Sequence, residues 1–209
     1  DATMFTKYGS VAAVINHNVA VMNNVAFNFR HEFPENIEFQ IVTQYVSTTF
    51  ANDPLSPNTT STAVNTVYNA FQAWGNAGNF GVTYDEALFW TNRDFDNNTI
   101  GYAGVGSICS TNKYAILQDF STDATSLRSL VAHEMGHNWG ANHDADGSPF
   151  IMAPSVNGSN VWSIASKNSV NSNIPTYSCL STCNGQVSAL FTSTPGALCL
   201  SGTVSYKDK

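Results

Sequence analysis

Apolar residues recur three or four positions apart in four parts of the chain, and each part predicts an amphipathic helix. Polar residues that can cap a helix, or a glycine that can end one, stand at several of the expected boundaries. The expected helices run from Ser10 to about Arg30, from Thr60 to Trp74 with Gly75 ending it, from Ser121 or Asp123 to Trp139, and from Asn160 to Val170.

β-branched and aromatic residues predict four strands between these helices. The expected strands are Ile37–Val46, with Phe39, Ile41 and Val42 facing the core, then Ala87–Thr91, Thr99–Gly106 and Lys113–Gln118. Residues 47–60 read as a loop and residues 141–157 as an irregular stretch. Interleaved helices and strands predict an α/β fold with a mostly parallel sheet.

The third helix carries the chain's main chemical signal, the run His133-Glu134-Met135-Gly136-His137. At about 100° per residue, two histidines four positions apart lie only about 40° apart around the helix axis. His133 and His137 can therefore bind one metal ion from the same face. Glu134 lies beside them, where its carboxylate can reach a metal-bound water.

Two later residues make this signal more specific. Gly140 allows the chain to leave the helix sharply, because glycine adopts positive φ without a steric penalty. His143 can then return as a third ligand. Three protein ligands and one water are typical of catalytic zinc, so we expect one Zn²⁺ with Glu134 as the general base.

The extended run HExxHxxGxxH, followed by Met152 in a tight turn, resembles the metzincin metalloproteases. Asp144 directly after the third histidine, and Ile151-Met152-Ala153-Pro154, resemble the adamalysin or reprolysin branch, which includes the ADAM and snake-venom proteases. The resemblance covers about residues 1–182 and implies a secreted zinc endopeptidase that hydrolyses peptide bonds of proteins.

The resemblance also implies a domain organisation. Residues 1–182 would form the catalytic domain, with a mixed, mostly parallel twisted sheet and a long active-site helix in an upper part, 1–140. A small irregular C-terminal subdomain, 141–182, would lie below it. Residues 183–209 share no likeness with the family and are expected to form a hairpin-like extension or linker. In this branch a hydrophobic strand precedes the segment that resembles Thr3–Tyr8, so we expect either a first strand upstream of Asp1 or a sheet that is built differently at that position.

The glycine-rich stretch before Cys109 resembles the strand that rims the cleft in this branch. An exposed strand edge can pair with an extended peptide, although glycines can also reflect close packing alone. By resemblance, residues after the methionine line a pocket for an apolar side chain just after the scissile bond. The expected substrate-binding residues are Ile100, Gly101, Tyr102, Ala103, Ala153, Ser155 and Val156.

Two further residues have expected structural roles near the zinc. The resemblance, which includes Pro154 in the same turn, makes Met152 an apolar floor under the imidazoles. Asp144 is expected to accept backbone hydrogen bonds that brace this turn. A hydrogen bond from a zinc-binding histidine to Asp144 is the competing role.

Four cysteines, an even number, are typical of a disulfide-bonded secreted protein. The even number alone leaves open all three ways in which four cysteines can form two disulfides. The resemblance implies that Cys109 pairs with Cys179, which leaves Cys183 and Cys199 to close a local loop.

Composition limits the possible partners. A net charge of −7 disfavours nucleic acid and anionic membranes, which both need a basic surface. No apolar run approaches the length of a membrane span. We expect a monomer that acts on protein or peptide substrates, with an inhibitory propeptide in the precursor, as the resemblance implies.

Calcium and one alternative function complete these expectations. The branch often binds calcium far from the zinc, but only Asp85 of that site is matched, and Ser181 or Thr182 replaces the family's asparagine. The competing function is a zinc-retaining binding or toxin-like module. Loss of Glu134 or of a ligand histidine would favour that reading, and all of them are present.

Overall fold

The computed structural model describes residues 1–33, 37–55 and 61–181 of the chain. Among these residues, no helix is long and apolar enough to cross a membrane. The helices are α1 (Ala2–Tyr8), α2 (Val11–Glu32), α3 (Val64–Asn76), α4 (Ala124–Asn138) and α5 (Ile164–Asn173), with short 3-10 turns at Phe50–Asn52, Asp96–Asn98 and Ile174–Thr176. The strands are β1 (Ala87–Thr91), β2 (Gly101–Ala103) and β3 (Tyr114–Gln118).

The three strands form one mixed sheet in the order β1-β3-β2. β1 runs parallel to β3, with Ala87 opposite Tyr114, and β2 runs antiparallel to β3, with Gly101 opposite Leu117. The expected strands around β1 and β3 are confirmed, whereas β2 is shorter than the predicted range 99–106. A mixed α/β fold is therefore present, and a mostly parallel sheet stays a prediction.

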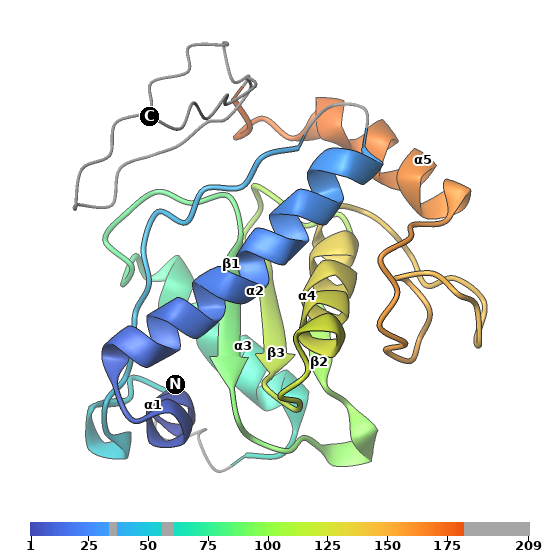
Figure 1. Ribbon diagram of the computed structural model, residues 1–209. Coiled ribbons are helices and arrows are strands. Elements are labelled where there is room, and N and C mark those ends of the chain that lie inside the picture. The colour runs from blue at the N-terminus through green and yellow to red at the C-terminus, as the bar shows by residue number, and fades with distance from the viewer. Residues whose placement is uncertain (34–36, 56–60, 182–209) are drawn as a thin grey trace, which may run out of the picture.

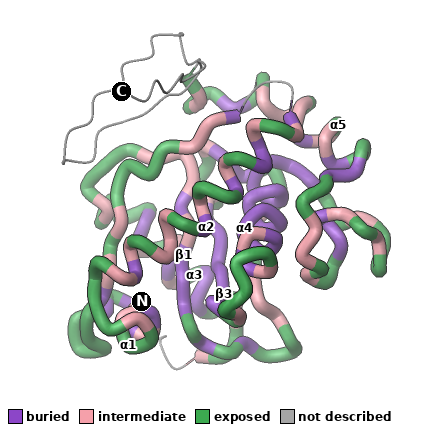
Figure 2. Tube along the Cα trace, in the orientation of Figure 1, coloured by how far each residue is buried: buried purple, intermediate pink, exposed green. Residues whose placement is uncertain are grey.

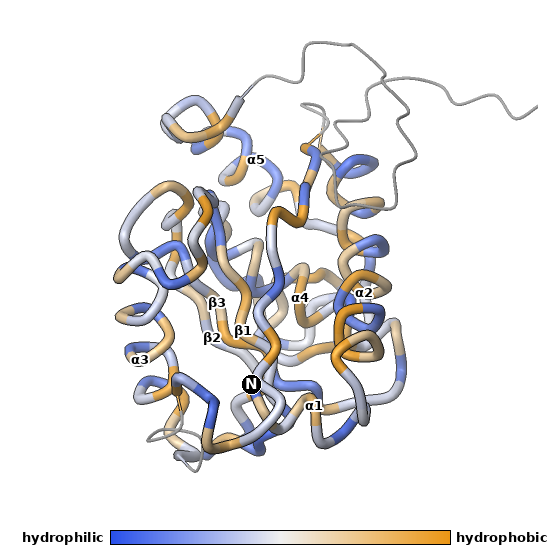
Figure 3. The backbone as a smooth tube through the Cα atoms, turned by 90° about the vertical axis from the view of Figure 1, so that its left-hand side faces the viewer, coloured by the Kyte–Doolittle hydropathy of each residue, from blue (hydrophilic) through white to orange (hydrophobic). Residues whose placement is uncertain are grey.

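Helices cover both faces of this sheet. α2 and α4 lie on one face and α3 on the other, as Figures 1 and 3 show. β3 is buried throughout, and its side chains alternate between the two layers. Leu117 packs with the apolar residues of α2 and α4, while Tyr114 and Ile116 pack with those of α3.

The strand predicted at Ile37–Val46 is wrong. Residues 37–46 join no ladder, and Ile41 and Val42 are exposed at 41% and 46%. Residues 38–47 and residues 87–90 of β1 line one groove of about 370 Å³, and the two segments are not paired in a ladder. At one side of this groove the Asp1 amino group donates to the Trp90 carbonyl at 3.1 Å. The strand expected before Asp1 stays a prediction.

The first and third predicted helices are confirmed, and the other two start later than predicted. α3 begins at Val64, beyond residues 61–63, and Thr60 itself lies outside the described residues. Gly75 does not end α3: it is buried within the helix, where a Cβ would meet the Tyr114 ring at 2.5 Å. α5 begins at Ile164, because residues 160–162 are held out of the helix by tertiary hydrogen bonds to Asn28 and Ile151.

A disulfide joins Cys109 to Cys179, as the resemblance implied. It links the segment after β2 to the segment after α5, and the 70-residue separation encloses the whole of α4. Cys183 and Cys199 lie outside the described residues, as does the expected hairpin-like extension 183–209.

Replacing both Cys109 and Cys179 by Ser is expected to lower the free energy of unfolding by about 4 kcal/mol, because a loop of this length gains much conformational entropy when opened. For a chain of this size that corresponds to a fall in Tm of roughly 8–16 °C. Thermal unfolding followed by circular dichroism measures it, with the reduced parent protein as control. A variant with the same Tm as the oxidised parent would contradict this expectation.

Candidate metal centre

Helix α4 holds the first three residues of the predicted site in the centre of the molecule. The helix begins where the Asp123 carboxylate accepts hydrogen bonds from the backbone N–H groups of Thr125 and Ser126. Residues 129–138 are all buried, as the continuous purple segment of α4 shows in Figure 2. In a helix that is buried on all sides, a polar side chain needs hydrogen-bond partners from neighbouring segments, and few orientations provide them.

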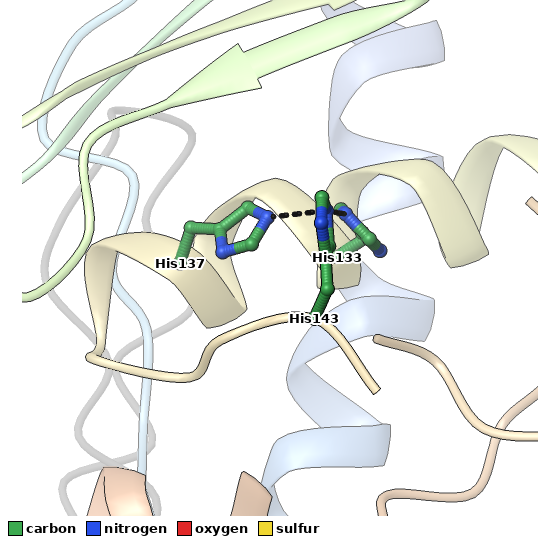
Figure 4. A group of neighbouring side chains, drawn as sticks. All are labelled: His133, His137 and His143. Carbon is green, nitrogen blue, oxygen red and sulfur yellow. Dashed lines mark hydrogen bonds between the residues drawn. The ribbon is translucent and has the colours of Figure 1, made fainter. Parts of the chain in front are cut away.

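His133, His137 and His143 converge on one point through their Nε2 atoms (Figure 4). The Nε2 atom of His143 lies 3.1 Å from that of His133 and 3.1 Å from that of His137. Two nitrogens bound tetrahedrally to zinc, each about 2.0–2.1 Å away, stand about 3.3 Å apart. The two spacings to His143 are therefore close to those of a zinc site, all three ligand atoms lie within 4.8 Å of one another, and the ligand type fits zinc.

Backbone carbonyls fix the orientation of the two helix histidines. The Nδ1 atom of His133 lies 2.8 Å from the Ile151 carbonyl, and Nδ1 of His137 lies 2.8 Å from the Ala141 carbonyl. A carbonyl only accepts, so each Nδ1 carries the proton and each Nε2 presents a lone pair to a metal. Burial lowers the pKa of His133 to about 4 and also lowers the pKa of His137, which favours the neutral, metal-binding form.

Gly140 brings the chain back to the metal point. Its φ is +102°, a left-handed conformation that favours glycine, and a Cβ there would meet the Asn173 amide at 2.3 Å. The N–H of Gly140 donates to the His137 carbonyl, and that of Ala141 donates to the Gly136 carbonyl. This closed turn returns His143 toward the helix, as the sequence predicted.

Glu134 lies next to the histidines but outside their cluster. Its side chain is almost buried, at 5% exposed, against strand β2. Burial raises the pKa of this carboxyl to about 8 in the metal-free protein. A divalent cation held by the neighbouring imidazoles would favour the ionised form, which can accept a proton.

The predicted structural residues of the turn all follow His143 in the chain. Met152 is fully buried, and its sulfur lies against Gly136, a residue that stands between the two helix histidines in the sequence. Asp144 departs from the expected contacts, because its carboxylate accepts hydroxyl hydrogen bonds from Ser163 and Ser166 at the start of α5. Its backbone N–H still donates to the Met152 carbonyl, at 2.8 Å. Pro154 is exposed.

The expected substrate-binding residues fall into two groups. Ile100, Gly101, Tyr102 and Ala103 lie in or beside β2, whose outer edge has no partner strand within the described ranges. Tyr102 is exposed at 40%, and its ring packs edge-to-face on Tyr68. Of the second group, Ala153 is buried, Val156 packs against the core, and Ser155 is exposed.

Sequence reasoning missed a buried polar contact beside the site. The Asn138 side chain donates to the carbonyls of Gly104 and Tyr114 and to the Ser107 hydroxyl. It ties the end of α4 to the segment after β2 and so fixes the distance between helix and edge strand. An asparagine next to a ligand histidine was the available signal, but its three partners are distant in sequence.

One metal-binding group stands out in the part of the chain that the structure describes. The three histidines form the one set of three or more His, Cys, Asp or Glu side chains there that could hold an ion. Asp85 belongs to no such set among these residues, and its backbone carbonyl accepts from Cys109. Calcium binding at Asp85 stays a prediction.

Known proteins match this chain over most of its length. A reprolysin family model, described as metallo-peptidase family M12, matches residues 1–189. A zinc metalloproteinase of Deinagkistrodon acutus, named recombinant fibrinogenase II, is 32% identical over 164 residues, which cover 75% of this chain and 67% of that protein.

Two longer relatives match a shorter stretch. A zinc metalloproteinase-disintegrin-like protein of Cerberus rynchops is 50% identical over 64 residues, and one of Bungarus multicinctus over 62 residues. These alignments cover 30% and 29% of this chain but only 10% of each relative. Together with the match to the family model, they show that the chain belongs to metallo-peptidase family M12, in its reprolysin branch of zinc metalloendopeptidases.

Proposed function

We propose that this chain is the catalytic part of a zinc endopeptidase that hydrolyses internal peptide bonds of proteins. The observation that carries the proposal is the convergence of three histidine ligand atoms within 4.8 Å of one another, with the buried Glu134 beside them. Three protein ligands leave one coordination position open for chemistry. A purely structural zinc domain would need a fourth protein ligand.

His133, His137 and His143 would hold the zinc. Once bound, zinc supplies a Lewis acid that polarises the attacking water and the scissile carbonyl. Glu134 accepts the proton of that water as the water attacks, and then delivers it to the departing amine. Its position against β2 places it between the metal ligands and the strand edge where we expect the peptide.

The proposed substrate is an extended polypeptide that pairs with the outer edge of β2. Main-chain groups of Gly101, Tyr102 and Ala103 would form the ladder, which makes binding depend on backbone more than on side chains. Ala153, Ser155 and Val156 would line the pocket for the residue after the scissile bond. Small and apolar side chains in this stretch favour an apolar residue there.

The remaining expectations belong to the same proposal. Residues 1–182 would act as the catalytic domain, as a monomer, released outside the cell and kept inactive in its precursor by a propeptide. The Cys109–Cys179 disulfide supports an oxidising compartment. Most of the complete sheet would be parallel, as β1 and β3 are.

Cleavage of a diverse peptide mixture by the zinc-loaded chain, mapped by mass spectrometry, tests this function. We expect internal cuts enriched in an apolar residue directly after the cleaved bond, and no cuts when a chelator has removed the zinc. Cuts with no preference at that position would contradict the pocket assignment. A chain that keeps zinc and cleaves nothing would favour the binding-module alternative.

A further inference from the structure

Glycine at position 101 leaves a space that the Glu134 side chain fills. A Cβ built on Gly101 would lie 2.2 Å from Oε1 of Glu134, 2.6 Å from Cδ and 2.8 Å from Cγ. Real Cβ atoms do not approach other heavy atoms that closely, so the two side chains cannot coexist in this arrangement. The carboxyl group of Glu134 therefore takes the place of a side chain on the edge strand.

Neither element can easily move to relieve such a contact. Gly101 is held by its pairing with Leu117 in the sheet, and the Ile100 carbonyl accepts from the Gln118 N–H at 2.8 Å. Glu134 belongs to a helix whose end is tied to the segment after β2 by Asn138. An added methyl group would be accommodated most easily by displacing the Glu134 carboxyl.

We propose that Gly101 is a positioning residue for Glu134, an inference that rests on the proposed function. Because Gly101 has no side chain, the Glu134 carboxyl can lie against the strand edge that would bind the peptide. One stretch of backbone thus aligns both the substrate and the general base. Of the two interpretations of the glycines in this strand, close packing therefore applies to Gly101. The group packed against it is the proposed base itself.

A double-mutant cycle in Tm, the thermal cycle, tests the contact between Gly101 and Glu134 without any need for catalytic activity. We compare Tm for Gly101→Ala in the parent and in a Glu134→Ala background, both metal-free. In the parent, overpacking is expected to lower Tm by roughly 2–10 °C. In the Glu134→Ala background the same change should leave Tm unchanged or raise it, because the space is empty and alanine suits a strand better than glycine. Equal losses in both backgrounds, or unfolding in both, would overturn the proposal.

A kinetic cycle tests the positioning role in the zinc-loaded chain. Gly101→Ala is expected to lower kcat for peptide cleavage by about 10²-fold, because a displacement near 1 Å at a reacting group has this effect. Zinc content should stay the same and KM should change far less than kcat. In a Glu134→Asp background, whose carboxyl is one methylene shorter, Gly101→Ala should cost no more than about twofold. If Gly101→Ala lowers kcat by the same factor in the Glu134→Asp background as in the parent, the proposal is overturned.

Gly104→Ala is the matched control. It replaces a glycine directly after the same strand, where a Cβ would meet Ser107 at 3.4 Å and the Asn112 carbonyl at 3.6 Å, both ordinary contact distances. We expect kcat and Tm close to those of the parent. A loss in this variant as large as that of Gly101→Ala would mean that the strand end tolerates no side chain, and would overturn the specific role of Gly101.

The two cycles separate this inference from the proposed function. If the zinc-loaded parent cleaves no peptide, the proposed function fails, and the thermal cycle alone still decides whether Gly101 and Glu134 are coupled. If the parent cleaves in a Glu134-dependent way and both cycles are additive, only the role of Gly101 fails.

Discussion

Replacing Glu134 by Gln is expected to lower kcat for peptide cleavage by about 10²–10⁴-fold while zinc stays bound. The amide has nearly the shape of the carboxyl and fits the same buried space beside Gly101, but it cannot take a proton from the attacking water. The three imidazoles remain, so the metal site is unchanged. Cleavage rates at matched zinc content, measured by mass spectrometry and metal analysis, give the comparison.

Glu86→Gln is a closely matched control for this prediction. Glu86 is a half-buried glutamate, and burial of its carboxyl raises its pKa to about 8, as it does for Glu134. Its carboxylate accepts from the Trp139 indole and lines the groove beside β1, which includes none of the three histidines. This variant should keep the parent's kcat. A Glu134→Gln protein that cleaves as fast as Glu86→Gln would remove Glu134 from the reaction.

Replacing His143 by Ala is expected to weaken zinc binding by more than about 100-fold, because loss of partners that merely orient ligands already costs 10–100-fold. Peptide cleavage should fall to the level of the chelated parent. His143 is exposed and lies after the helix, so the metal-free fold should survive its loss. Titration with zinc, monitored by Tm, measures the effect: a zinc concentration that just saturates the parent should raise Tm of the parent far more than that of the variant.

His31→Ala separates this effect from the loss of any histidine. His31 is exposed on α2, and its Nδ1 contacts only the Phe27 carbonyl one turn earlier among its described neighbours. The zinc-dependent rise in Tm should persist in this variant. If His143→Ala binds zinc as tightly as His31→Ala, the third ligand must come from elsewhere, and the proposed centre would be wrong.

Local signals in the sequence predicted the starts of α2 and α4 and the convergence of three histidines, for a physical reason. A cap and the residues that it stabilises lie within one turn, so Ser10 and Asp123 mark the starts of α2 and α4 without reference to the rest of the chain. The spacing of His133 and His137 follows from helix geometry alone. Gly140 and His143 extend the same local motif by six residues.

Tertiary structure decided what depends on partners distant in sequence. The β-rich residues 37–46 form no strand because a strand needs a partner in a ladder, and residues 38–46 line a groove instead. Gly75 lies in the last turn of α3, where the Tyr114 ring leaves no room for a Cβ, a contact that no local signal in the sequence reports. The carbonyls of Ile151 and Ala141, which orient the imidazoles, leave no side-chain signal in the sequence.

The sequence by itself thus determined the three-histidine cluster, the position of the proposed base and the helix that carries them, because each is encoded within a few consecutive turns. Only the tertiary structure decided how that base is placed against Gly101, because this contact joins residues 33 positions apart on a strand and a helix. Periodicity in a sequence reports which face of an element is buried, but not which atoms of another element it meets.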